Sequence, residues 1–181
     1  MTYELFSRIA NNPGDSRPLV QKLVGVPFWK EAVCSNYMKY QDGRVVTEEC
    51  SVTAKTIQGK YIVFTMDSQY YRQPMHGILS YDEKALAYKQ WALFGTNLTE
   101  ETVVIDFEKK ITASTGRYEP GFMEIAVGAF SDKESSEHAL AYKDGTLFLT
   151  RDSKTRPITR QTSEPGNTAN RNRGIHPEKA P

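Results

Sequence analysis

The stretch HALAYKDGTLFLT, residues 138–150, decides the fold class of this chain. Two short, mainly apolar runs, residues 138–142 and 146–150, flank Lys143-Asp144-Gly145. Short runs of this kind on either side of a turn signal are typical of strands. An Asp-Gly pair supplies the positive φ angles that a tight hairpin turn needs. These residues therefore predict two antiparallel β-strands joined by a short turn.

The same pattern extends outward from this hairpin over residues 28 to about 151. A second Asp-Gly turn lies within residues 41–44, residues 82–85 form another hairpin connection, and residues 60–67 alternate without interruption. Short strands at regular spacing are typical of antiparallel barrels and sandwiches. We predict an all-β fold, a single antiparallel β-barrel of about ten strands, although periodicity alone fits a sandwich as well.

The two ends of the chain differ from this strand-rich middle. Residues 1–27 predict a short N-terminal helix, capped by Asp15 or Ser16, that covers one end of the barrel. Residues 154–181 contain no aromatic residue and predict a flexible, low-complexity tail, with one extended stretch near Ile158 held against the barrel. The expected division is 1–27, 28–153 and 154–181.

Charge and composition exclude several classes of protein. The 181 residues carry 23 Lys and Arg against 22 Asp and Glu, a net charge of +1. The tail holds +4 of this and the remainder −3, so the barrel is no dedicated nucleic-acid binder. The sequence contains no run of eighteen apolar residues that would predict a membrane span. Residues 1–12 lack the pattern of a signal peptide. We therefore expect a cytoplasmic protein.

Two cysteines, Cys34 and Cys50, lie in neighbouring predicted strands. Two cysteines make no disulfide framework, and there is no CxxC motif. We interpret them as reduced thiols, although a bridge between adjacent strands is geometrically conceivable.

One region resembles a known family. The motif Gln73-Pro74-Met75-His76-Gly77 leads into Ser80-Tyr81-Asp82-Glu83, and a strand with a tyrosine and a tryptophan, Tyr88 and Trp91, follows. This pattern is similar to that of a lipocalin-like, uncharacterised bacterial family known as a domain of unknown function. The resemblance covers residues 45–94, with Ser80 where the family has Gly. It implies a calycin-type barrel closed around a cavity, and it implies no established reaction.

The expected function is the binding of a small apolar or amphipathic ligand inside the barrel. Tyr71 and Arg72 lie in a connection between strands, where a hydroxyl and a guanidinium can hold a carboxylate head group. His76, Tyr88 and Trp91 complete the candidate binding residues as parts of the wall. Two alternatives stay open: an enzyme acting on a small acid within the barrel, and a filled barrel that works as an interaction module and forms a homo-oligomer.

Few residues suggest chemistry. The three histidines show no HxH, HxxxH or HExxH spacing, so we predict neither a metal site nor a cofactor. Nucleophile elbows, phosphate loops and dinucleotide motifs are missing from the sequence. Glu48, Asp67 and Glu124 are the acid–base candidates. Carboxylates on strands usually occupy solvated outward positions, and we place these three there, so whether the protein is an enzyme stays open.

Overall fold

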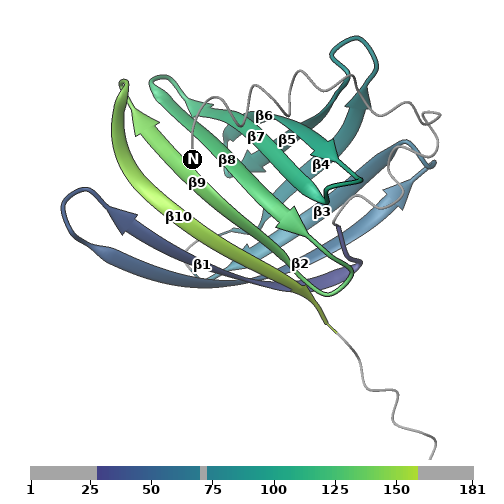
Figure 1. The fold of residues 1–181 in the computed structure, drawn as a ribbon, viewed down its shortest axis with the longest axis horizontal. Helices are drawn as coiled ribbons and strands as arrows, with labels where there is room; N and C mark the ends of the chain where they lie inside the picture. Colours follow the sequence, from purple (N-terminus) through teal and green to yellow (C-terminus); the bar gives the residue numbers. More distant parts are fainter. Residues whose placement is uncertain (1–27, 70–72, 159–181) are drawn as a thin grey trace, which may run out of the picture.

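The computed structural model describes residues 28–69 and 73–158, which form ten antiparallel strands and no helix (Figure 1). The strands are β1 (Glu31–Tyr40), β2 (Val45–Ile57), β3 (Tyr61–Ser68), β4 (Met75–Asp82), β5 (Ala87–Phe94), β6 (Asn97–Asp106), β7 (Ile111–Glu119), β8 (Phe122–Phe130), β9 (Ser135–Lys143) and β10 (Thr146–Pro157). The predicted number of strands is confirmed. The predicted N-terminal helix and residues 159–181 lie outside the described residues.

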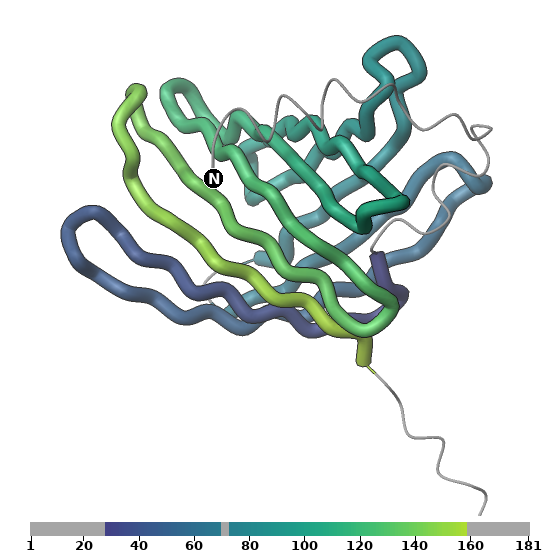
Figure 2. The backbone as a smooth tube through the Cα atoms, viewed as in Figure 1, coloured from purple at the N-terminus to yellow at the C-terminus, as the bar shows by residue number. Residues whose placement is uncertain are grey.

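The strands close into a barrel. Each strand pairs with the next one along the chain, and β1 pairs with β10, which closes the ring. Figure 2 follows this path through successive hairpins, from purple β1 to yellow-green β10 beside it. Closure leaves no free sheet edge and decides between the two architectures that periodicity allowed. No helix in the described part of the chain is long and apolar enough to cross a membrane.

Both Asp-Gly turns form as predicted. Gly43 has a φ of +87°, and Asp144 and Gly145 have φ of +49° and +79°. The two-residue turn at Asp144-Gly145 needs both left-handed angles to match the twist of its strands, whereas the connection from Tyr40 to Val45 is longer and uses a left-handed angle at Gly43. In the hairpin between β4 and β5, the Asp82 carboxylate accepts hydrogen bonds from the Lys84 and Ala85 amides at 2.9 and 3.2 Å. These bonds form an Asx-turn, in which the aspartate side chain accepts hydrogen bonds from the backbone amides that follow it.

The last strand reaches further than the composition suggested. Residues 154–157, assigned to the tail, belong to β10 and pair with residues 32–35 of β1. The Ile158 amide then donates to the Glu31 carbonyl at 3.0 Å. Backbone pairing needs no apolar side chains, so composition alone misses the end of this strand.

The two cysteines correct one expectation. Cys34 of β1 and Cys50 of β2 are directly paired across the ladder, with Cα atoms 5.0 Å apart, and form a disulfide rather than two reduced thiols. The bridge closes a loop with a sequence separation of 16 residues. A crosslink over a loop of this size stabilises a fold by roughly 3 kcal/mol.

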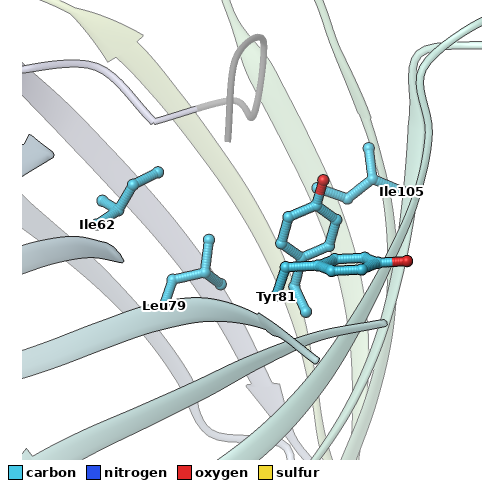
Figure 3. Packing of buried hydrophobic residues seen from close by; sticks show 5 residues of the cluster. Ile62, Leu79, Tyr81 and Ile105 are labelled. Atoms are coloured by element: carbon cyan, nitrogen blue, oxygen red, sulfur yellow. The ribbon is translucent and has the colours of Figure 1, made fainter. Parts of the chain in front are cut away.

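Side-chain alternation sorts every strand into an inward and an outward face, because paired residues share a face. One half of the inward face, carried by β3 to β6, is apolar. We call it the apolar half: Ile62, Phe64, Met75, Leu79, Tyr81, Tyr88, Ala92 and Ile105. Figure 3 shows Ile62, Leu79, Tyr81 and Ile105 projecting into the same space. Tyr88 and Leu79 are each only 1% exposed, which makes this half the hydrophobic core.

One glycine fits the apolar half closely. Gly77 of β4 pairs with Phe64 of β3, and the Phe64 ring lies over it. A Cβ atom at this position would overlap the ring, so only glycine allows Phe64 to pack there.

Candidate functional site

The other half of the inward face is polar and charged. The register places seven residues of β5 to β10 there, which we call the Arg151 cluster: Gln90, Glu101, Ser114, Tyr118, Glu124, Glu137 and Arg151. Charged side chains that face the interior of a barrel are costly unless they are paired. The hydrogen bonds and ion pairs between these side chains therefore determine which charges and donors stay unmatched in the site.

Arg151 is the centre of this cluster. Its Nη2 atom donates to Glu124 Oε1 at 2.5 Å and to Glu137 Oε1 at 2.9 Å. Tyr118 donates its hydroxyl to the same Glu124 oxygen at 3.2 Å. One guanidinium is thus shared by two carboxylates from β8 and β9, which lie on successive strands of the wall.

Glu101 adds a third carboxylate. Gln90 of β5 donates to its Oε2 atom at 2.7 Å. Burial raises the pKa of Glu101 to about 7, and the nearby Glu137 carboxylate adds to this rise. Burial also raises the pKa of Glu137, against the opposing effect of Arg151. A carboxyl group with a pKa near 7 exchanges protons at neutral pH.

The two remaining ionisable groups respond to the same carboxylates. Burial raises the pKa of Tyr118 well above its usual value, and Glu101 and Glu124 raise it further. Burial by itself would lower the pKa of Arg151, but the charges of Glu124 and Glu137 outweigh this and raise it. Arg151 therefore keeps its charge and Tyr118 its proton at neutral pH.

Two bulges bring aromatic rings to this part of the interior. The register shifts at Tyr118 in β7 and at Phe148 in β10, and a bulge turns consecutive side chains toward one face. The Tyr118 and Phe122 rings meet edge-on, with their centroids 5.7 Å apart, and the centroids of Phe122 and Phe148 are 6.0 Å apart. Phe148 also contacts Tyr40 at 5.4 Å. The Arg151 cluster thus borders an aromatic surface.

A second polar group lies further around the wall. Glu48 of β2 is buried and accepts hydrogen bonds from Asn36 of β1, at 2.8 Å, and from the Ser68 hydroxyl of β3. Asn36 is the direct partner of Ser153 in β10, and Ser153 is the direct partner of Glu137 in β9. Polar side chains therefore continue around the inward face from β9 to β3.

These positions correct the expectation for the acidic residues. Glu48 and Glu124 face inward and are 3% and 8% exposed, so their predicted outward placement is wrong, whereas Asp67 is exposed. On β8 the inward positions belong to Phe122, Glu124 and Ala126 rather than to the more apolar set that alternates with them. Hydrophobic alternation alone would place the more apolar set of β8 inward. This is wrong here because the interior of the barrel is partly polar.

Two buried donors in the cluster are unpaired. Arg151 Nε and Ser153 Oγ are buried and have no hydrogen-bond partner in the described part of the chain. Arg151 and Ser153 are separated by one residue on β10 and share the inward face. A buried donor without a partner costs free energy, so each would be stabilised by any acceptor that reaches it.

The structure separates the ligand-binding residues predicted from sequence. Tyr88 faces inward, at the centre of the apolar half, with its ring 5.0 Å from Tyr81. His76 and Trp91 occupy outward register positions, and the His76 ring lies 3.1 Å from the Thr65 hydroxyl. Tyr71 and Arg72 lie outside the described residues.

Sequence reasoning missed Arg151, Glu101, Glu137 and the role of Tyr118. The available signal was parity. Counting alternate positions outward from the Asp144-Gly145 turn pairs Arg151 with the outward-facing His138. The bulge at Phe148, between the turn and Arg151, shifts this pairing by one residue, to Ala139, and so turns Arg151 inward.

A groove of about 480 Å³ runs over β8, β9, β10 and β1. Most of its lining residues face outward, such as Tyr37 and the His138–Asp152 pair, but it also includes the inward-facing Asn36, Glu137 and Ser153. The Nδ1–Oδ1 distance of the His138–Asp152 pair is 2.7 Å, and the side chains are 43% and 62% exposed. Exposed pairs contribute little to stability. Among residues 28–69 and 73–158, no group of three or more His, Cys, Asp or Glu side chains is arranged to hold a metal ion.

Comparisons with known proteins show likeness at the level of the fold. No family model matches the chain, and no curated protein matches its sequence. Rv2717c from M. tuberculosis superposes with a TM-score of 0.60 at 11% identity, covering 80% of this chain and 100% of that one. A protein of unknown function from the DUF3598 family of Nostoc punctiforme gives a TM-score of 0.51 at 8% identity. That match covers 73% of this chain, which spans about half (48%) of the other structure.

A third solved structure, the S-type phycobiliprotein lyase CPES from Guillardia theta, has 11% identity and a TM-score of 0.47, covering 88% of this chain and 95% of that one. At such identities the first two structures establish the fold only. Together with the closed ten-strand barrel of this chain, they fit the resemblance to a lipocalin-like family of unknown function.

Proposed function

We propose that the protein is a calycin-type barrel that binds one small apolar or amphipathic molecule in its interior. The supporting observation is that inward-facing side chains remain in contact with water. The Glu137 side chain is 33% exposed and that of Arg151 is 24% exposed, although both point into the barrel. Water-accessible side chains on the inward face support open space between opposite strands, which a barrel filled with side chains lacks.

The two halves of the interior adjoin at β6. The apolar end of an amphipathic molecule can therefore contact one half while its polar end contacts the other. Glu101 belongs to the Arg151 cluster, whereas Val103, at the next inward position, pairs with Tyr88 of the apolar half. Successive inward positions on a strand are separated by roughly 7 Å. A small molecule therefore spans the two halves, with its apolar part against Tyr88 and its polar end near Arg151.

The remaining candidate residues keep a place in this proposal. Tyr71 and Arg72 belong to the connection between β3 and β4, and we retain them as proposed contacts at the barrel mouth. His76 and Trp91 lie on the outer face, so their proposed role concerns a ligand bound there rather than one inside.

Native mass spectrometry of freshly purified protein, followed by thermal shift with fatty acids, isoprenoids and haem, tests the proposal. Val103→Trp adds bulk to the inward face, and Val104→Trp adds the same bulk at the next, outward position. We expect Val103→Trp to weaken binding at least tenfold and Val104→Trp to leave it unchanged. Neither a bound mass nor a shift across the whole panel would contradict the proposal.

A second function, an enzyme acting on a small acid, is favoured by one observation. Glu101 lies in the interior with a pKa of about 7, which suits a general acid or base at neutral pH. The test is turnover of a panel of small carboxylic acids. Glu101→Gln should abolish turnover, and Glu100→Gln, which changes the adjacent exposed residue, should retain it. Absence of turnover in the wild type leaves binding as the function.

A further inference from the structure

We propose that the polar end of the bound molecule is an uncharged hydrogen-bond acceptor, such as a ketone, amide or ester carbonyl, and that carboxylates are rejected. This inference rests on the proposed binding in the barrel and specifies the head group that the Arg151 cluster takes. It follows from two properties of the cluster, its open donor and its charge.

The open group at Arg151 can only donate. A guanidinium nitrogen has no acceptor function, and Arg151 Nε is buried without a partner in the described chain. The Ser153 hydroxyl, on the same face of β10, is unpaired as well.

The charge of Arg151 is already matched. Its Nη2 atom contacts Glu124 and Glu137 at 2.5 and 2.9 Å, so two carboxylates share one cation. Glu101 lies near enough for its charge to act on both Arg151 and Tyr118. An anionic head group would become the fourth carboxylate in a partly buried space, where like charges repel strongly.

A neutral carbonyl oxygen satisfies both constraints. It accepts from Arg151 Nε or Ser153 Oγ and adds no net charge to the cluster. The cluster also borders the rings of Tyr118 and Phe122, which offer apolar surface next to the head group. The raised pKa of Glu101 agrees with this picture, because the excess carboxylate takes up a proton more readily than it stays charged.

Three probes of equal chain length separate the possibilities: hexyl methyl ketone, octanoate and octane. Binding to the full chain is measured by calorimetry at about pH 8, where octanoate is ionised. We expect the ketone to bind at least tenfold more tightly than the other two. Equal or tighter binding of octanoate would overturn the inference, as would a ketone that binds no better than octane. In those cases binding inside the barrel stands, whereas no binding of any probe would refute the proposed function itself.

Two variants test the cause of this selectivity. Glu137→Gln removes one of the two carboxylates that neutralise Arg151, so octanoate affinity should rise about tenfold while ketone affinity stays constant. Glu100→Gln removes a charge from the neighbouring outer face and should change neither. Should Glu137→Gln fail to fold, Ser153→Ala gives an independent readout: ketone affinity falls severalfold and octane affinity does not. Unchanged selectivity in Glu137→Gln would overturn the charge argument.

Discussion

The apolar half and the Arg151 cluster form two sides of one interior, yet they are stabilised differently. Tyr88 and Leu79 are almost completely buried among apolar side chains, whose attraction has no preferred direction. Arg151 and Glu137 keep part of their surface in water and depend on hydrogen bonds of defined geometry. In the proposed function the two halves have different roles. The apolar half supplies stability, and the Arg151 cluster supplies selectivity and a response to pH.

The largest effect is expected in the apolar half. Tyr88→Ala should lower the free energy of unfolding by about 3–5 kcal/mol, because it leaves a cavity beside Tyr81 in the tightest part of the core. Urea denaturation measures the change, and the loss should be the same at acidic and neutral pH. Tyr61→Ala, on the outer face and 37% exposed in the wild type, is the control and should cost less than about 1 kcal/mol. Equal losses of unfolding free energy in Tyr88→Ala and Tyr61→Ala would contradict the assignment of Tyr88 to the core.

A smaller effect, dependent on pH, is expected from the Arg151 cluster. Arg151→Met leaves Glu124 and Glu137 without their cation and should cost about 3 kcal/mol at neutral pH. The cost should shrink as acid protonates these carboxylates. Arg156→Met removes an equivalent guanidinium from its outer-face pair with Glu134, where screening by solvent should make the loss much smaller than in Arg151→Met. A loss in Arg151→Met that is independent of pH would show that packing, not charge, explains it.

The smallest effect concerns Glu101 alone. Its pKa is about 7 in the folded protein and 4.5 as an ordinary value, so the folded state holds more protons between these limits. The wild type therefore loses stability as pH rises from about 4.5 to 7. Glu101→Gln should lose this dependence and become more stable than the wild type by about 2 kcal/mol above pH 7, a figure reduced because the side chain keeps some contact with water. Denaturation at a series of pH values measures it. Glu100→Gln is the control and should keep the pH dependence of the wild type. The same pH dependence of stability in Glu101→Gln would show that another group titrates.

Local patterns predicted the strands well. The turns at Asp42-Gly43 and Asp144-Gly145 depend on the conformational freedom of neighbouring residues, and both form as expected. The prediction for the candidate site was poorer, because Glu48 and Glu124 were placed outside on the assumption that charged strand residues face water. That assumption fails where an inward cation such as Arg151 compensates the charge, and its position depends on strand pairing and on a bulge.

By itself the sequence determined an all-β chain of about ten strands, because alternation and turn chemistry act over a few neighbouring residues. Only the tertiary structure decided that the sheet closes between β1 and β10 and that Cys34 meets Cys50. It also decided that Glu101, Glu124 and Glu137 converge on Arg151. These contacts join residues from distant parts of the chain. They depend on register, and a shift of one residue moves every side chain of a strand to the opposite face.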